Sequence, residues 1–237
     1  MQPTADLPNL IAAETKTSVI YAVSLAETGW HKNRVPCLLI GNRAPIAIET
    51  RTGRIEGDAL FVAPGFDHRV LFGDQDGHVM YLECLRPTGP GKLFGSPATP
   101  LSAHQTSSLI AAMENWSTGA EREVRNRLFA QEENADVPRP LLHTIQTINR
   151  DPSLRMGQGA LSAALGLERT QSLKAFKAAT GMTLRSYQIW KALRTAIGDV
   201  VQGGTLQTAG LDSGFCDAPH FSRSVRATFG LSPSSLS

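Results

Sequence analysis

The stretch LQTAGLDSGFCDAPHFSRSVRATFG, residues 206–230, predicts the fold of the C-terminal part of this chain. Gly214 ends a short amphipathic helix, and Asp217 is placed to cap the helix that follows. The second helix has one polar face and one apolar face, formed by His220, Ser222, Arg223 and Arg226 on the first and by Phe221, Val225 and Phe229 on the second. A helix, a tight turn and a second helix with a basic leading face form the layout that enters a DNA major groove.

The side chains on this polar face have the chemistry that DNA recognition needs. Hydroxyl groups donate to phosphates or base edges, and arginine can form two parallel hydrogen bonds with guanine. The amides at a helix N-terminus also attract phosphate. The alternative is a solvated face on an ordinary helical hairpin, and this motif alone does not separate the two readings.

A second copy of the pattern lies upstream. An apolar helix is expected at residues 160–165 (ALSAAL), followed by a turn at Gly166 and by Leu167, which we expect to pack inward. A new helix is expected at residues 168–180 and ends at Gly181, a residue suited to a C-cap. Its polar face holds Arg169, Thr170, Gln171, Lys174 and Lys177, and Phe176 and Leu173 are assigned to its apolar side.

The two copies have similar endings, FKAATGMTLRSY at 176–187 and VRATFGLSPSSL at 225–236, and their glycines Gly166 and Gly214 are 48 residues apart. Repetition at this spacing predicts two related helical subdomains. Residues 184–201 between them predict one long helix with an apolar stripe of Tyr187, Trp190, Leu193, Ile197 and Val201. A rigid connecting helix would hold two recognition helices at the separation of about 34 Å that one turn of B-DNA requires.

Residues 138–236 resemble the DNA-binding region of the AraC/XylS transcription regulators. The resemblance rests on ALGLERTQSLKAFKAATGMTLRSY (164–187), on the KALRTA helix (191–196) and on GFCDAPHFSRSVRATFGLSPSSL (214–236). It implies seven helices, two recognition helices in adjacent major-groove segments of promoter DNA, and RNA polymerase as a partner if the protein activates transcription.

Roles are carried over from the family by position. The first recognition helix would present Thr170, Leu173 and Lys174 to the DNA. We add Arg169 and Gln171 on the basis of their side-chain chemistry and not of the family pattern. The second would present Ala218, His220, Ser222 and Arg223, with Pro219 at an early helix position that needs no amide donor.

Three residues depart from the family pattern. Ser172 stands where a leucine is usual, and Leu173 stands where a polar residue is common. Either the first recognition helix is rotated slightly, or Ser172 is buried against a backbone carbonyl. Val225 replaces a usual phenylalanine, and Phe221 and Phe229 would compensate for its smaller volume.

Charge is distributed unevenly along the 237 residues. From Asp151 onward there are nine Lys/Arg against five Asp/Glu, a net charge of +4, whereas the first 150 residues hold 14 against 16, a net charge of −2. The positive field therefore lies where the motifs lie, which favours specific DNA binding at moderate salt.

The three cysteines, Cys37, Cys84 and Cys216, form no CxxC pair, which favours a reducing cytoplasm over a disulfide framework or zinc site. No apolar run approaches the ~20 residues of a membrane span. The beginning, MQPTADLPNL, lacks a basic region followed by an apolar core, so we expect no signal peptide.

The N-terminal part predicts short strands at 18–25, 36–40, 44–51, 59–63, 69–72 and 78–85, with a turn at Thr52-Gly53. Such a series is typical of a small barrel or jelly roll. The phrase GDALFVAPGFDHRV, residues 57–70, resembles the second sequence motif of cupins, and an AraC-type DNA domain after a cupin-like sensor is a known family architecture. The alternative is a simple Pro-Gly hairpin corner.

Cupin metal sites usually add two histidines and a glutamate from a first motif, which is missing here, so we expect no metal and no other cofactor. A barrel interior can instead hold a small organic ligand. The candidates to bind it are Trp30, His31, Arg34, Arg51, His68, Arg69 and Tyr81. The arginines would suit an anionic effector.

We expect three regions: a sensor at 1–86, a Pro/Gly-rich linker and connecting helices at 87–135, and the DNA-binding domain at 136–237. The connecting helices, at 101–115 and 119–131, would either pair across a homodimer or pack on their own barrel, and residues 132–139 would form a hinge. The fold class is α+β.

The sequence therefore predicts a DNA-binding transcription regulator, not an enzyme, with a small-molecule effector. Two alternatives remain open: a cupin-type metal enzyme fused to a binding module, and a protein-interaction module with a degenerate helix-turn-helix.

Overall fold

The computed structural model describes residues 12–14, 18–23, 27–73, 75–83, 96–114, 124 and 137–235. By backbone contacts the chain forms two compact units. We call them the strand unit, comprising 1–83, 90–130 and 225–237, and the helical unit, comprising 84–89 and 131–224. No helix among the described residues has the length and apolar character needed to cross a membrane.

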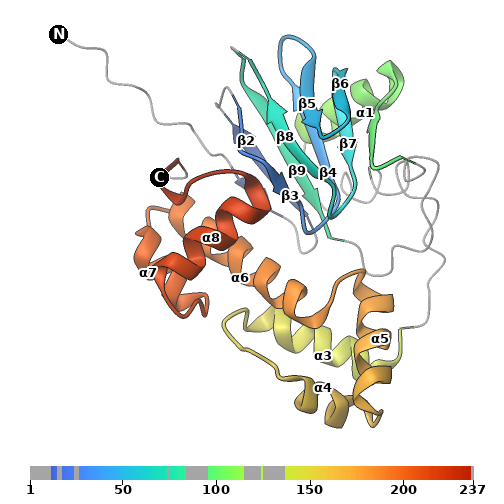
Figure 1. Cartoon of the computed structure of the whole chain (residues 1–237), viewed down its shortest axis with the longest axis vertical. Helices are drawn as coiled ribbons and strands as arrows, with labels where there is room; N and C mark the ends of the chain where they lie inside the picture. Colours follow the sequence, from blue (N-terminus) through green and yellow to red (C-terminus); the bar gives the residue numbers. More distant parts are fainter. Residues whose placement is uncertain are drawn as a thin grey trace. The chain divides into compact units, whose positions relative to one another are not determined.

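The strand unit is built from two antiparallel sheets (Figure 1). The larger sheet has the order β1-β2-β9-β4-β7-β10 and the smaller one the order β3-β8-β5-β6. The strands are β1 (Ala12–Glu14), β2 (Ser18–Val23), β3 (His31–Lys32), β4 (Cys37–Gly41), β5 (Ile46–Thr50), β6 (Gly53–Gly57), β7 (Ala59–Val62), β8 (Asp67–Leu71), β9 (Gly77–Leu82) and β10 (Ala98–Pro100).

Apolar side chains from both sheets fill the space between them. All four residues of β7 are buried, as are Leu38 and Ile40 of β4 and Ile46 and Ile48 of β5. Full burial of one such side chain stabilises the fold by about 1.5–3 kcal/mol. This two-sheet, cupin-like arrangement is the one that the sequence predicts.

The six predicted strands are confirmed as β2, β4, β5, β7, β8 and β9. Residues 98–100, within the region expected to hold the Pro/Gly-rich linker, form the additional strand β10, which pairs with β7. The pattern also missed β1, β3 and β6. β1 and β3 have only three and two residues, and β6 is largely exposed, so none of them carries a clear apolar signal.

The helix predicted at 101–115 is confirmed as α1 (Ala103–Glu114), which lies beside the strands in Figure 1. The helix predicted at 119–131 lies outside the described residues except for Val124, which is buried. Most of the predicted hinge, residues 132–136, also lies outside them.

The last residues of the chain pack on the strand unit. The Gly29 amide donates to the Gly230 carbonyl over 2.7 Å, and Arg34 Nε donates to Thr228 Oγ1 over 3.0 Å. The Phe229 ring meets the Tyr81 ring edge-on, with 5.4 Å between centroids. These contacts explain why residues 225–237 belong to the strand unit.

The helical elements of the C-terminal region are α3 (Arg139–Arg150), α4 (Gln158–Leu165), α5 (Arg169–Thr180), α6 (Leu184–Val201), α7 (Leu206–Asp212), α8 (Ala218–Phe229) and the 3₁₀ turn η2 (Pro233–Ser235). These are the seven helical elements that the family resemblance implies. In Figure 1, α6 runs between a group formed by α3–α5 and the pair α7 and α8.

The predicted long helix is confirmed as α6. Thr183 caps its N-terminus, because the Thr183 hydroxyl accepts from the Ser186 amide over 3.2 Å. Trp190, Leu193 and Ile197 of the predicted stripe are each 2% exposed or less. A helix buried along this length is the element that holds the two motifs together.

Candidate nucleic-acid interface

The turn between α7 and α8 depends on Gly214. Its φ of +84° lies in the left-handed region that favours glycine. A Cβ atom at this position would also lie 2.6 Å from the Ser153 carbonyl oxygen, in the loop between α3 and α4. Gly214 therefore allows both the turn and a close approach to the loop that precedes the first motif.

The N-terminus of α8 is capped as predicted, because Asp217 Oδ1 accepts from the His220 amide. Ala218 and Arg223 are exposed, and His220 and Ser222 are half-buried. The His220 ring packs edge-on against Phe215, with 5.2 Å between centroids. Val225, Phe221 and Phe229 are all buried, which agrees with the expectation that the two phenylalanines compensate for the small volume of Val225.

The α5 helix begins one residue later than predicted, because Glu168 is its N-cap. It ends at the predicted C-cap Gly181, whose φ is +71°. Arg169, Thr170, Gln171 and Lys174 are exposed, and Arg169 Nε donates to Gln158 Oε1.

The structure decides between the two explanations for Ser172. This residue is fully buried, and its hydroxyl donates to the Leu167 carbonyl over 3.2 Å. Leu173 is consequently half-exposed on the polar side of α5, so its assignment to the apolar side is wrong. The expectation that Leu167 packs inward is also wrong, because 42% of its surface is exposed.

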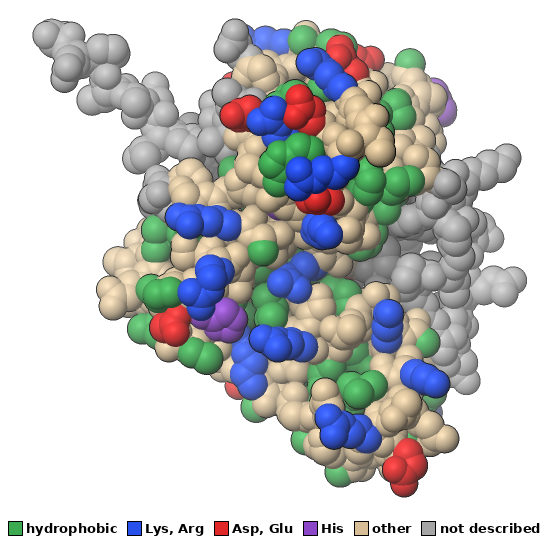
Figure 2. Space-filling model, viewed as in Figure 1, with side chains coloured by type: hydrophobic (Ala, Val, Ile, Leu, Met, Phe, Trp, Pro, Cys, Tyr) green, Lys and Arg blue, Asp and Glu red, His purple; other side chains and the backbone are tan. Residues whose placement is uncertain are grey.

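A groove of about 760 Å³ lies between the two motifs. Thr170, Leu173 and Lys174 of α5 line one side, and Cys216 and His220 line the other. Among the described residues, four cationic side chains and no acidic ones line it, namely Arg155, Lys174, Lys177 and Arg185. Figure 2 shows basic side chains spread over the helical region with few acidic ones among them.

The structure thus brings four of the expected DNA-facing residues to one groove: Thr170, Leu173, Lys174 and His220. Arg169, Gln171, Ala218, Ser222 and Arg223 lie outside its lining. Sequence reasoning did not select Arg155, Arg185 or Gln188, which also line the groove. Arg155 lies in a loop with no periodic signal, so only the three-dimensional structure could reveal it.

The expected effector-binding residues lie in several places of the strand unit. His31 and His68 are buried neighbours on paired strands, with ring centroids 4.3 Å apart. Burial, together with the nearby His68, lowers the pKa of His31 to about 4. Burial also lowers the pKa of His68, whose buried Nε2 has no hydrogen-bond partner among the residues that the structure describes.

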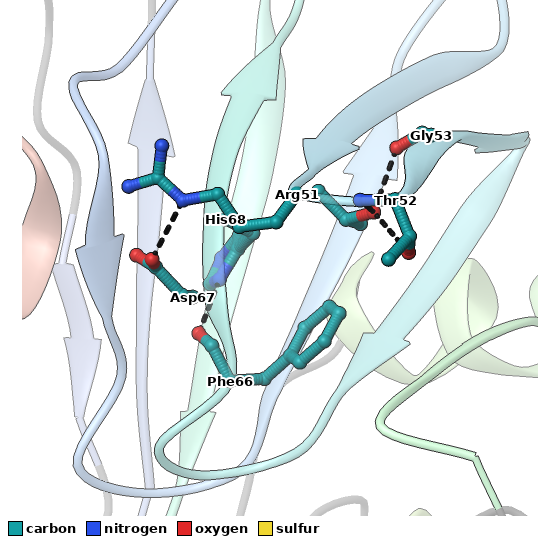
Figure 3. Close-up of polar contacts among 7 residues, drawn as sticks. Arg51, Thr52, Gly53, Phe66, Asp67 and His68 are labelled. Atoms are coloured by element: carbon teal, nitrogen blue, oxygen red, sulfur yellow. Dashed lines mark hydrogen bonds and ion pairs between the residues drawn. The ribbon is translucent and has the colours of Figure 1, made fainter.

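Two of the arginines expected to bind an anion already have acidic partners. Arg51 Nε donates to Asp67 over 3.0 Å, as Figure 3 shows, and its guanidinium lies 3.9 Å from the centre of the Trp30 ring. Arg69 Nε donates to Glu49 over 2.6 Å. This hydrogen bond lowers the pKa of Glu49 and raises that of Arg69.

Arg34 and Tyr81 are the partners of Thr228 and Phe229 described above.

Cys37 is buried as a free thiol, and burial raises its pKa. Within the described part of the chain, no three His, Cys, Asp or Glu side chains are placed to hold a metal ion.

Comparison with known proteins bears out the fold. Residues 161–237 match a protein-family model described as a helix-turn-helix domain. The matched residues include α5 and α8, the helices on the two sides of the groove. This match agrees with the helix-turn-helix motifs predicted for the C-terminal region. None of the curated protein sequences matches this chain.

Among solved structures, this chain is similar in fold to ToxT from Vibrio cholerae. The apo structure of a single-substitution variant of ToxT is 10% identical over 92% of this chain and 96% of its own, with a TM-score of 0.61. ToxT bound to (E)-4-(8-methylnaphthalen-1-yl)but-3-enoic acid is 10% identical over 93% and 98%, with a TM-score of 0.59. Wild-type ToxT bound to an unsaturated fatty acid is 9% identical over 94% and 96%, with a TM-score of 0.56.

Proposed function

We propose that this protein is a cytoplasmic transcription regulator that binds promoter or operator DNA through two adjacent major-groove segments. Its role would be binding and not catalysis. The single observation that carries the proposal is the groove lined by both motifs, with four cationic side chains and no acidic ones. Such a surface attracts the phosphate backbone of a duplex.

Within this proposal the two recognition helices make different contacts with DNA. Lys174 and Lys177 on α5 would contact phosphates, and Thr170 would reach a base edge. On α8, His220, Ser222 and Arg223 would read bases, Arg223 by a bidentate contact to guanine. Gln171 and Arg169 on α5, and Ala218 on α8, would complete the surface facing the duplex.

The test is selection of binding sites from a pool of random duplexes with the full chain, followed by footprinting of the selected duplex. We expect protection of two neighbouring major-groove segments on one face of the DNA. Arg223→Ala should cost about 1–3 kcal/mol and relax specificity at one base position. Failure to prefer any sequence over random duplex at physiological salt would contradict the proposal.

We also propose that a small anionic effector binds the strand unit and changes the affinity for DNA. The two ligands bound in the ToxT structures described above, a fatty acid and an arylbutenoic acid, are carboxylic acids. In this chain Arg34 and Tyr81 contact the end of α8, so an effector that engaged them would compete with Thr228 and Phe229. The remaining candidates are Trp30, His31, Arg51, His68 and Arg69.

Oleate is a suitable first probe for this effector proposal. We expect oleate to raise the melting temperature of the full chain and to change its affinity for the selected duplex. Arg34→Ala should reduce both effects, whereas Arg54→Ala, on exposed β6, should leave them unchanged. Identical DNA-binding curves over a panel of carboxylates would contradict effector control.

A homodimer completes the proposal, with the connecting helices at 101–131 as the contact and RNA polymerase as the partner of an activator. Ile110 of α1 is 41% exposed and would lie in the contact. Sedimentation should show a dimer that Ile110→Glu weakens and that exposed Ala111→Glu does not. A wild-type monomer at micromolar concentration would contradict this part of the proposal.

A further inference from the structure

The loop between α3 and α4, residues 151–157, leads directly into the first DNA-binding motif and contacts the turn of the second. Within the loop, Asp151 accepts hydrogen bonds from both the amide and the hydroxyl of Ser153. These contacts lower the pKa of Asp151, so the loop is held by a carboxylate that stays ionised. The Gln188 side chain of α6 donates to the Met156 carbonyl over 3.0 Å.

Arg155 joins this loop to the second motif. Its Nη2 donates to two carbonyl oxygens just after α7, those of Ser213 at 3.2 Å and Gly214 at 2.9 Å. Its Nη1 donates to the Pro152 carbonyl at 2.9 Å and, more weakly, to the Gln188 carbonyl of α6 at 3.4 Å. One guanidinium therefore connects the loop that leads into the first motif, the long helix α6 and the turn of the second motif.

Other observations show that this junction is closely packed. The Arg155 guanidinium lies 5.7 Å from the centre of the Phe215 ring. Ser153 and Gly214 approach so closely that a Cβ atom on the glycine would overlap the serine backbone. Partial desolvation lowers the pKa of Arg155, which remains a cation because arginine holds its proton very strongly.

These contacts require the shape of arginine as well as its charge. A guanidinium presents five donors in a fixed planar fork, so it can serve carbonyls on several segments at once. A lysine ammonium is a compact charge on a flexible stem and does not reproduce that fork. The cation is also well placed electrostatically, since it lies at the C-terminal end of α7.

We propose that Arg155 is a positioning residue that fixes the separation and orientation of the two recognition helices, and so selects the spacing between the two DNA half-sites. This inference rests on the proposed DNA-binding function. When two binding modules are joined rigidly, the second binds as if at high local concentration, but only at the matching spacing. Loosening the junction lowers affinity at the matching spacing and relaxes the penalty at others.

The test compares the full-length wild type with Arg155→Lys, Arg155→Met and Arg185→Ala on four duplexes. The first carries the selected site, the second and third carry one or two inserted base pairs between its halves, and the fourth carries one half-site alone. Arg185 is an exposed cation on the same groove, so its replacement controls for the loss of charge. Circular dichroism melts establish that each variant folds.

For the wild type we expect each insertion, which displaces one half-site by about 3.4 Å per base pair, to weaken binding strongly. Arg155→Lys and Arg155→Met should bind the native spacing about tenfold more weakly, lose most of the insertion penalty and bind the single half-site normally. Arg185→Ala should weaken all four duplexes alike and keep the insertion penalty.

Two results would overturn the inference. One is a wild-type insertion penalty in both Arg155 variants. The other is that Arg155→Met loses equal affinity for the single half-site and for the full site, while Arg155→Lys keeps the wild-type affinity. That result would make Arg155 a direct phosphate contact. If the wild type itself selects no sequence, the proposed function fails, and the junction is then tested without DNA.

The DNA-free readout is the distance between nitroxide labels at Ala164→Cys on α4 and Asp212→Cys on α7, both exposed, with Cys84 and Cys216 replaced by serine. The distance distribution should be narrow with Arg155 and broad with Arg155→Lys. Identical distributions would contradict the positioning role, whatever the DNA experiments give.

Discussion

Single residues in this protein carry out tasks that their types alone do not reveal. His31 and His68 are expected ligand-binding residues, yet both are buried within the strand unit. Their Nδ1 atoms lie 2.9 Å from the carbonyls of Gly29 and Phe66, the second of which is drawn in Figure 3. The two imidazoles therefore help to hold the local backbone, whatever else they bind.

The first prediction concerns the pH dependence of stability. Because the pKa of His31 is about 4 in the fold and about 6.5 when unfolded, the unfolded chain takes up the proton first as the pH falls. Stability should therefore decrease between pH 6.5 and pH 4, by an amount on the order of 3 kcal/mol. Urea unfolding at several pH values should show a smaller decrease for His31→Gln, and an unchanged one for exposed His143→Gln.

The second prediction separates backbone strain from crowding. Gly214→Ala places a Cβ at positive φ and against Ser153, whereas Gly203→Ala places one at φ +95° in open space. Strain alone should cost about 1–2 kcal/mol at each position. Urea unfolding should show a clearly larger loss for Gly214→Ala, and equal losses would contradict the close contact.

At the scale of the elements, local chemistry determines where helices start and stop. The glycines Gly166 and Gly181 end α4 and α5 as predicted, because each adopts the left-handed conformation that a following turn requires. The hydroxyls of Thr183 and Thr205 begin α6 and α7 in the same way, each by accepting from an amide three residues on.

The third prediction tests the cap of α6. Thr183→Ala removes the acceptor for the Ser186 amide and should lower the free energy of unfolding by about 1 kcal/mol. Thr183→Ser keeps the hydroxyl and should stay within a few tenths of a kcal/mol of the wild type. A full loss in the serine variant would show that the methyl group matters more than the cap.

The fourth prediction tests whether α5 contacts phosphates. Lys177 is exposed on α5 and lines the groove. Lys177→Ala should reduce the slope of log affinity against log salt by about 1 and weaken different duplexes nearly alike. Lys177→Arg keeps the charge and should retain the slope. A change confined to one sequence would instead indicate a base contact.

At the scale of the whole molecule, the sequence predicted what repeats and periodic patterns encode. The two helix-turn-helix copies and the buried face of α6 follow from local spacing, and so do the six principal strands. Contacts between distant segments could not be predicted in this way. Arg34 and Thr228 are 194 residues apart, and neither residue carries a signal that it will meet the other.

The candidate site shows the same division. The exposed residues of α5 and α8 follow from helical periodicity, whereas the contacts of Arg155 depend on how three segments come together. The unusual residues Ser172 and Leu173 show most clearly what the sequence alone cannot predict. The sequence allowed two explanations, and only the hydroxyl contact with Leu167 distinguished them.

The attachment of residues 225–237 to the strand unit has a practical consequence for dissecting the protein. A recombinant fragment covering 136–237 would retain both helix-turn-helix copies but lose Arg34 and Tyr81, the partners of Thr228 and Phe229. Its last helix should fray, with faster amide hydrogen exchange and earlier proteolysis after Arg226 than in the intact chain. Equal protection in the fragment would show that α8 folds without help from the N-terminal half.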